Sequence, residues 1–118
     1  DGWQALPPSA ILSGMLSRYG AKEAKGKWEK GAILLDVRED TELRIASVKG
    51  ALHIPMGQVP QRLAELPKDR EILCMCHHGM RSEAVAELLL ENGFTQIANL
   101  EGGIAAWSAD VDPSVPQY

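Results

Sequence analysis

The clearest pattern of hydrophobic positions lies between residues 72 and 90, with the sequence ILCMCHHGMRSEAVAELLL. Residues 72–75 form an unbroken apolar run, which is too short for a helix and is typical of a strand buried on both faces. After residue 82, apolar side chains recur at helical spacing, while Glu83, Glu87 and Glu91 line another face. The pattern therefore predicts a strand, a tight loop over residues 76–82 and a helix.

Shorter patterns of the same kind occupy the rest of the chain. Further strands are expected at residues 3–6, 32–35, 51–54 and 96–100, and further helices at residues 10–16, 39–46, 60–66 and 102–107. Asn92-Gly93 is a good end for the central helix, and Gly102-Gly103 predicts a tight turn into the final helix. The charged segment GAKEAKGKWEKG at residues 20–31 predicts a surface loop or an extra helical turn, with Trp28 packed onto the core.

Strands that alternate with helices in short units favour a mainly parallel sheet covered by helices on both faces. In such a sheet, ligands bind beyond the carboxyl ends of the strands. Asp36, Cys76 and the pair Gly102-Gly103 each come just after a predicted strand. The sequence therefore predicts an α/β fold with about five strands and a candidate site at one edge of the sheet.

Composition narrows the class of protein further. A chain of 118 residues that is 45% hydrophobic fits a single domain over residues 1–118. The net charge of −4 and the lack of a basic cluster argue against nucleic acid as a partner, and no apolar run approaches the roughly 18 residues of a membrane helix. We expect a soluble, monomeric, cytoplasmic protein, with a targeting segment removed before Asp1 as the alternative.

The two cysteines, Cys74 and Cys76, have different expected roles. They lie too close in sequence for a disulfide in extended backbone. Cys74 falls in the apolar strand and is expected to be an inert core residue. Cys76 precedes a helix, whose first N–H groups and dipole attract negative charge. Because Arg81 adds a positive charge and Gly79 allows N–H groups to point inward, we predict a reactive thiolate at Cys76.

At these residues the sequence resembles the rhodanese-like sulfurtransferase family, whose active-site loop has the pattern Cys-x-x-Gly-x-Arg-Ser. Every fixed position is present, as Cys76, Gly79, Arg81 and Ser82. The resemblance extends to residues 34–39, 50–55 and 102–107, and so covers nearly the whole chain. It implies a single rhodanese-like domain. Ser47 stands where many members have histidine, which affects a local structural contact rather than the chemistry.

The resemblance implies a sulfurtransferase that holds sulfur as a persulfide on Cys76. The donor is a small molecule such as thiosulfate, and the acceptor is a thiol, cyanide or a small, thioredoxin-like redox protein. No metal or organic cofactor is expected. The implied substrate-binding residues are His77, His78, Gly79, Met80, Arg81 and Ser82. Asp36 and Arg38 are expected to support the site, Arg38 through a structural ion pair or cap, and Asp36 either in that pair or by bracing the loop.

Three other interpretations compete with this one. A metal site would use Cys74, Cys76, His77 and His78. However, structural zinc sites combine two separated ligand clusters, and His53 is the one histidine elsewhere, so we interpret His77 and His78 as loop walls.

The second alternative is a Cys-dependent phosphatase or arsenate reductase. The similar loops of those enzymes have five residues between cysteine and arginine, whereas four residues separate Cys76 from Arg81 here. The smaller ring suits a persulfide sulfur better than a phosphate. The third is a rhodanese-like module that only binds or regulates partners. Such modules often lack the cysteine, so its presence here favours an enzyme.

Overall fold

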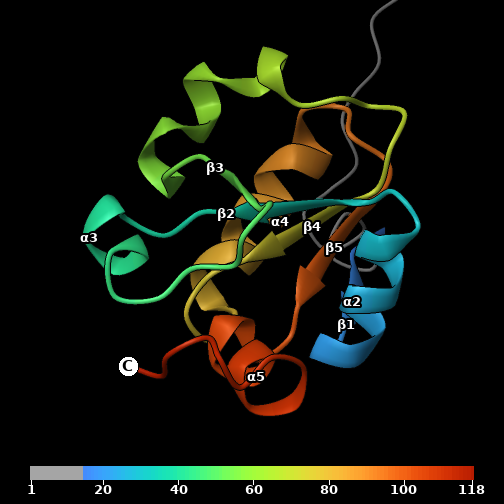
Figure 1. Cartoon of the computed structure of the whole chain (residues 1–118). Helices are drawn as coiled ribbons and strands as arrows, with labels where there is room; N and C mark the ends of the chain where they lie inside the picture. Colours follow the sequence, from blue (N-terminus) through green and yellow to red (C-terminus); the bar gives the residue numbers. More distant parts are fainter. Residues whose placement is uncertain (1–14) are drawn as a thin grey trace, which may run out of the picture.

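The computed structural model describes residues 15–118, and at the centre of this part of the chain is a five-stranded parallel sheet in the order β1-β5-β4-β2-β3 (Figure 1). The strands are β1 (Ser17–Tyr19), β2 (Ile33–Asp36), β3 (Leu52–His53), β4 (Ile72–Met75) and β5 (Ile97–Leu100). The helices are α2 (Ala21–Glu29), α3 (Asp40–Leu43), α4 (Met80–Glu91) and α5 (Gly103–Asp110), with 3-10 helices η1 (Met56–Gln61) and η2 (Leu63–Glu65). The predicted α/β class is confirmed.

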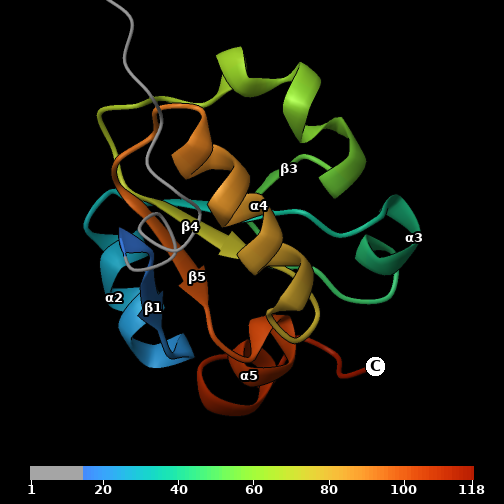
Figure 2. The ribbon, with the colours of Figure 1, turned by 180° about the vertical axis from the view of Figure 1, so that it is seen from behind.

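Two apolar cores lie on the two faces of the sheet, and β4 contributes to both. Its alternate residues Ile72 and Cys74 join the core that contains Val85 and Leu89 of α4. Leu73 and Met75 of β4 join the core that is built with helices α2 and α5. Figure 2 shows α4 in front of the sheet. Burial on both faces explains why the strand is apolar at every position.

Residues 20–31 are where the sequence-based prediction fails most clearly. A loop or single turn was expected, but Ala21–Glu29 forms the nine-residue helix α2. Ala21 and Ala24 are buried against the sheet, while the lysine and glutamate side chains provide the outer face. Trp28 packs edge-to-face on the buried ring of Trp107, with ring centroids 5.6 Å apart. The predicted packing of Trp28 onto the core is therefore confirmed, and Trp28 holds the helix together with Ala21 and Ala24.

Other predicted elements differ mainly at their ends. The expected strand at residues 3–6 and most of the helix at 10–16 lie outside the described residues, while β1 at Ser17–Tyr19 was not predicted. Pro60 was expected to begin a helix, but it lies inside η1, because the 3-10 turns already start at Met56. The end of α4 at Glu91, before Gly93 with its positive φ of 88°, agrees with prediction.

Within residues 15–118, none of the helices has both the length and the apolar character needed to cross a membrane.

Candidate active site

The loop between β4 and α4 forms the centre of the candidate site. Cys76 directly follows the strand, and Gly79 is the residue before the first turn of α4. Gly79 has φ of 113°, in the left-handed region that side chains with a Cβ rarely adopt. This conformation allows the chain to turn from the strand into the helix within four residues.

The Cys76 sulfur lies inside this turn. Its residue is only 1% exposed, the Gly79 N–H donates to Sγ at 3.0 Å, and the Ser82 Oγ lies 3.3 Å from Sγ. Burial raises the pKa of the Cys76 thiol, but the Ser82 hydroxyl and the N–H groups of residues 82, 79 and 78 outweigh it. The resulting pKa is below the ordinary value of a thiol. The loop thus favours a thiolate, as a nest of N–H groups should.

Helix α5 holds the outer side of the loop. The N–H groups of Ile104 and Ala105 donate to the carbonyl oxygens of Cys76 and His77, at 2.9 and 3.2 Å. Because the C=O and N–H of a peptide unit point in opposite directions, these bonds turn the N–H groups of residues 77 and 78 away from α5. A Cβ on Gly103 would overlap both carbonyl oxygens. Gly103 is therefore needed for close contact with the loop as well as for the turn.

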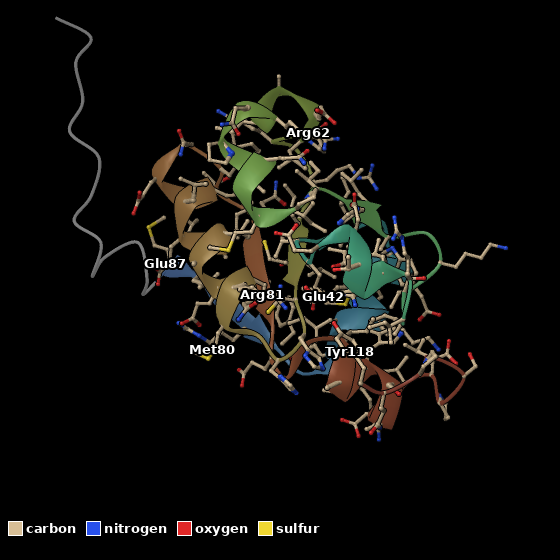
Figure 3. The ribbon with its side chains drawn as sticks, turned by 90° about the vertical axis from the view of Figure 1, so that its left-hand side faces the viewer. Glu42, Arg62, Met80, Arg81, Glu87 and Tyr118 are labelled. Atoms are coloured by element: carbon tan, nitrogen blue, oxygen red, sulfur yellow. The ribbon has the colours of Figure 1, made fainter. Side chains whose placement is uncertain are left out.

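Arg81 extends from α4 toward α3, where it meets a residue that sequence reasoning missed. Its guanidinium makes two hydrogen bonds to the carboxylate of Glu42, at 2.7 and 2.9 Å. This pairing is the main cause that lowers the pKa of Glu42 to about 2. Figure 3 shows Arg81 and Glu42 side by side above Tyr118. The positive charge of Arg81 is thus present near Cys76, as expected, but it is paired with the Glu42 carboxylate.

A cavity of about 360 Å³ opens at the loop and is lined by Cys76, His77, His78, Met80 and Arg81. Met80 is 85% exposed and lies at the outer edge of α4 in Figure 3. The volume is within the range of sites for small molecules, and Cys76 is the nucleophilic residue in its lining. The arrangement can deliver a thiolate to a small, electrophilic substrate.

A family model for the rhodanese-like domain matches residues 20–110 of the chain. The chain belongs to the rhodanese-like domain family. It is 42% identical over 80 residues to the putative sulfurtransferase YtwF of Bacillus subtilis, an alignment that covers 68% of this chain and 77% of YtwF. It is 32% identical to the thiosulfate sulfurtransferase GlpE of Vibrio cholerae, covering 67% of this chain and 74% of GlpE.

Solved structures agree with this membership. The crystal structure of a rhodanese-related protein from Thermoplasma volcanium superposes with a TM-score of 0.76 at 30% identity, covering 86% of this chain and 99% of that one. The sequence relatives named as sulfurtransferases support sulfurtransferase activity in general for this rhodanese-like domain.

The Asp36–Arg38 pair of this rhodanese-like domain is a fully buried ion pair. Arg38 donates to both carboxylate oxygens of Asp36, at 3.0 and 2.7 Å, and to the carbonyl oxygen of Ala46 at 2.9 Å. The ion pair predicted for Arg38 is confirmed. The Asp36 carboxylate is engaged by the Arg38 side chain and backbone N–H. Any support that the Asp36 carboxylate gives to the loop therefore passes through Arg38.

Tyr118 connects Arg38 to the loop, and the sequence-based prediction did not include it. Its hydroxyl accepts a hydrogen bond from Arg38 at 2.8 Å and donates one to Glu42 at 2.7 Å. Its ring stacks on His77, with centroids 3.8 Å apart, and His77 in turn stacks on His78 at 3.9 Å. The two histidines thus form one wall of the loop, as predicted. A single tyrosine far away in sequence carries no pattern that could have indicated this contact.

Cys74 has the buried environment that was predicted for it. Its side chain is fully buried, and burial raises its pKa to about 12. Among residues 15–118, no three or more His, Cys, Asp or Glu side chains are grouped so that they could hold a metal ion.

Asn99 on β5 is a third residue that the sequence did not single out. Its amide Nδ2 donates to the carbonyl oxygen of Gly79 at 2.9 Å, and its Oδ1 accepts from the Ser82 hydroxyl at 2.6 Å. Asn99 is 4% exposed. The one available signal was a polar residue inside the apolar strand IANL.

Proposed function

We propose that this domain accepts sulfane sulfur from a donor such as thiosulfate on Cys76 and passes it to a nucleophilic acceptor. The observation that carries the proposal is that Cys76 lines a small cavity and that backbone N–H groups are directed at its sulfur. The sulfurtransferase relatives support the same chemistry, and the name of GlpE supports thiosulfate as a donor.

The reaction has two half-reactions. In the first, the Cys76 thiolate attacks the outer sulfur of thiosulfate, a new S–S bond forms, and sulfite leaves with the electron pair of the broken S–S bond. The product is a cysteine persulfide whose negative charge lies on the outer sulfur. In the second, an acceptor thiolate attacks that outer sulfur and the Cys76 thiolate leaves. Charge and atoms balance without a metal or an organic cofactor.

The loop residues have separate roles in this scheme. The backbone N–H groups of the loop hold the negative outer sulfur, and Arg81 attracts an anionic donor to the cavity mouth. His77 and His78 form the wall, and the exposed Met80 leaves one side open to an acceptor. A cellular thiol or a small redox protein is the proposed acceptor, and cyanide serves as the acceptor in an assay.

Mass spectrometry after incubation with thiosulfate tests the proposal directly. We expect one added sulfur atom on the peptide that contains Cys76, and its loss when an acceptor thiol is supplied. The Cys76→Ser variant is the control for sulfur bound elsewhere. If several sulfane-sulfur donors fail to load the folded protein, the domain is a binding module.

Loop size tests the phosphatase alternative. Four residues separate Cys76 from Arg81, which leaves the N–H groups close to the sulfur and little room for the oxygens of a phosphoryl group. We expect sulfur transfer and essentially no hydrolysis of an aryl phosphate. One small residue inserted after Gly79 should weaken sulfur transfer and admit slow hydrolysis. Hydrolysis through Cys76 in the unaltered protein, at a rate similar to sulfur transfer, would contradict the size argument.

A further inference from the structure

The hydroxyl of Ser82 lies between two atoms that can both use its proton. Its Oγ is 2.6 Å from Oδ1 of Asn99 and 3.3 Å from Sγ of Cys76. Ser82 is completely buried and Asn99 is 4% exposed. The hydrogen bonds of this group are therefore decided by these neighbours and not by bulk water.

The orientation of the Asn99 amide is fixed by the loop. Nδ2 donates to the carbonyl oxygen of Gly79 at 2.9 Å. A flipped amide would place Oδ1 against that carbonyl, and two acceptors would face each other. Oδ1 must therefore point to Ser82.

The proton count at this point decides the arrangement. A serine hydroxyl has one proton to donate, and an amide oxygen has none. The contact of 2.6 Å between Ser82 and Asn99 therefore requires the serine proton. When that proton lies on Asn99, the sulfur of Cys76 meets only lone pairs of Oγ, and the Ser82 hydroxyl lowers the Cys76 pKa only when its proton is turned to Sγ. The contact with lone pairs suits a thiol, which can donate its own proton, and it does not suit a thiolate.

We propose that Asn99 is a positioning residue that competes with the Cys76 sulfur for the Ser82 proton. The thiolate can receive the proton only if Ser82 turns away from Asn99 and leaves a buried amide oxygen without a donor. A neutral sulfur atom at the Sγ position does not need the Ser82 proton, so Ser82 can keep its hydrogen bond to Asn99.

This role of Asn99 adds a detail to the proposed sulfur transfer, and its application to the persulfide rests on that proposed function. In the persulfide, the charge has moved to the outer sulfur, and the inner sulfur at Sγ is neutral. The Ser82 proton then returns to Asn99 while loop N–H groups hold the outer sulfur. The Ser82–Asn99 contact thus favours the loaded form of the enzyme over the free thiolate.

The other ionisable groups near Cys76 are the same in the unaltered protein and in every variant of the test. They are Cys74 on β4, His77 and His78 on the loop, Arg81 on α4 with Glu42 on α3, and Tyr118 beyond His77. Among residues 15–118, none of them is hydrogen-bonded to the Asn99 amide, whose partners are Ser82 and Gly79. A shift caused by an Asn99 substitution can therefore be assigned to Ser82 or to the Gly79 carbonyl.

The rate of Cys76 alkylation by iodoacetamide as a function of pH tests the proposal and requires no sulfur transfer. Asn99→Leu has a similar shape and no acceptor, so its midpoint should lie about one pH unit lower than in the unaltered protein. Ser82→Ala should raise the midpoint. In the Ser82→Ala background, Asn99→Leu should produce no further shift, because no proton is left to redirect.

A second substitution, Asn99→Ala, needs no additional space and guards against misfolding of the leucine variant, which circular dichroism would show. An unchanged or higher midpoint in the folded Asn99 variants would overturn the proposal. An equal shift with and without Ser82 would also overturn it and would assign Asn99 to the Gly79 carbonyl. Failure of sulfur loading with the expected alkylation shifts would instead reject the proposed function alone.

Discussion

Cys74 and Cys76 are separated by a single residue, and their environments differ in whether hydrogen-bond donors point at the sulfur. Cys74 and Cys76 are both almost completely buried, yet the pKa of Cys74 is raised to about 12 and that of Cys76 is lowered. The N–H groups around Cys74 are used by the ladders of β4 with β2 and β5. Beyond Met75 the strand ends, and loop N–H groups become available to the sulfur. The difference in thiol pKa is thus decided by the hydrogen-bond donors around the sulfur, the Ser82 hydroxyl and the loop N–H groups, rather than by burial.

Replacing each cysteine with serine should give the largest difference between the two positions. Cys76→Ser should reduce sulfur transfer at least about 10³-fold, because the nucleophile is lost. Cys74→Ser should keep most of the activity and cost about 1–3 kcal/mol of folding free energy for a buried hydroxyl. Thiosulfate-dependent turnover and denaturant unfolding measure the two effects. Equal loss of turnover in two folded variants would falsify the assignment.

Gly103→Ala should give the next largest effect. Its Cβ overlaps the carbonyl oxygens of Cys76 and His77, so the loop must move away from α5 and its N–H groups turn off the sulfur. We expect about 10²-fold slower transfer, as for a misplacement of about 1 Å, and a higher alkylation midpoint for Cys76. Gly26→Ala is the matched control, since a Cβ there meets nothing within 4 Å. Normal activity in Gly103→Ala would show that α5 does not shape the loop.

A smaller effect is expected from the ion pair beside the loop. Arg81→Ala should raise the alkylation midpoint of Cys76 by less than about one pH unit, because Glu42 already offsets part of the charge. Glu42→Gln should move the midpoint in the opposite direction, since it leaves the Arg81 charge uncompensated. The pH dependence of alkylation in both variants measures this. If neither midpoint moves, Arg81 acts through structure alone.

The smallest effect is expected on stability in acid, which tests the ion pair between Arg81 and Glu42 near the loop. The folded pKa of Glu42 is about 2, below its ordinary value of 4.5, mainly because Arg81 donates to it. The carboxylate therefore stabilises the fold above pH 4.5, and that contribution is lost as the pH falls from about 4.5 to about 2. The free energy of unfolding should differ between the unaltered protein and Glu42→Gln near neutral pH, and most of that difference should be lost by about pH 2. A difference that is constant with pH would reject the charge effect.

The sequence was sufficient for the parts of the site that are local in the chain. The apolar run, the loop and the helix follow one another within residues 72–91, so periodicity and the position of Gly79 predicted both the turn and a loop that lowers the pKa of Cys76. Glu42, Asn99 and Tyr118 could not be predicted in this way. Each comes from another part of the chain, and each polar contact depends on how these parts pack in three dimensions.

Helix α2 shows the same limit within the fold. Its charged composition indicates a surface segment, and its two buried alanines form too weak a pattern to reveal the face on the sheet. The tertiary contact of Trp28 with Trp107 gives this segment its place. Strand β1 likewise has three residues and gains its structure by pairing with β5.

The sheet order also determines when the domain can be completed during translation. Strand β5 lies between β1 and β4, although it follows both in sequence. While a ribosome is still making residues 83–96, β1 has no partner, and the carbonyl groups of Cys76 and His77 await the N–H groups of α5. Cys76 is therefore synthesised well before the segment that shapes its loop. We therefore expect the nascent chain to carry an ordinary thiol until residues 97–105 have emerged and docked.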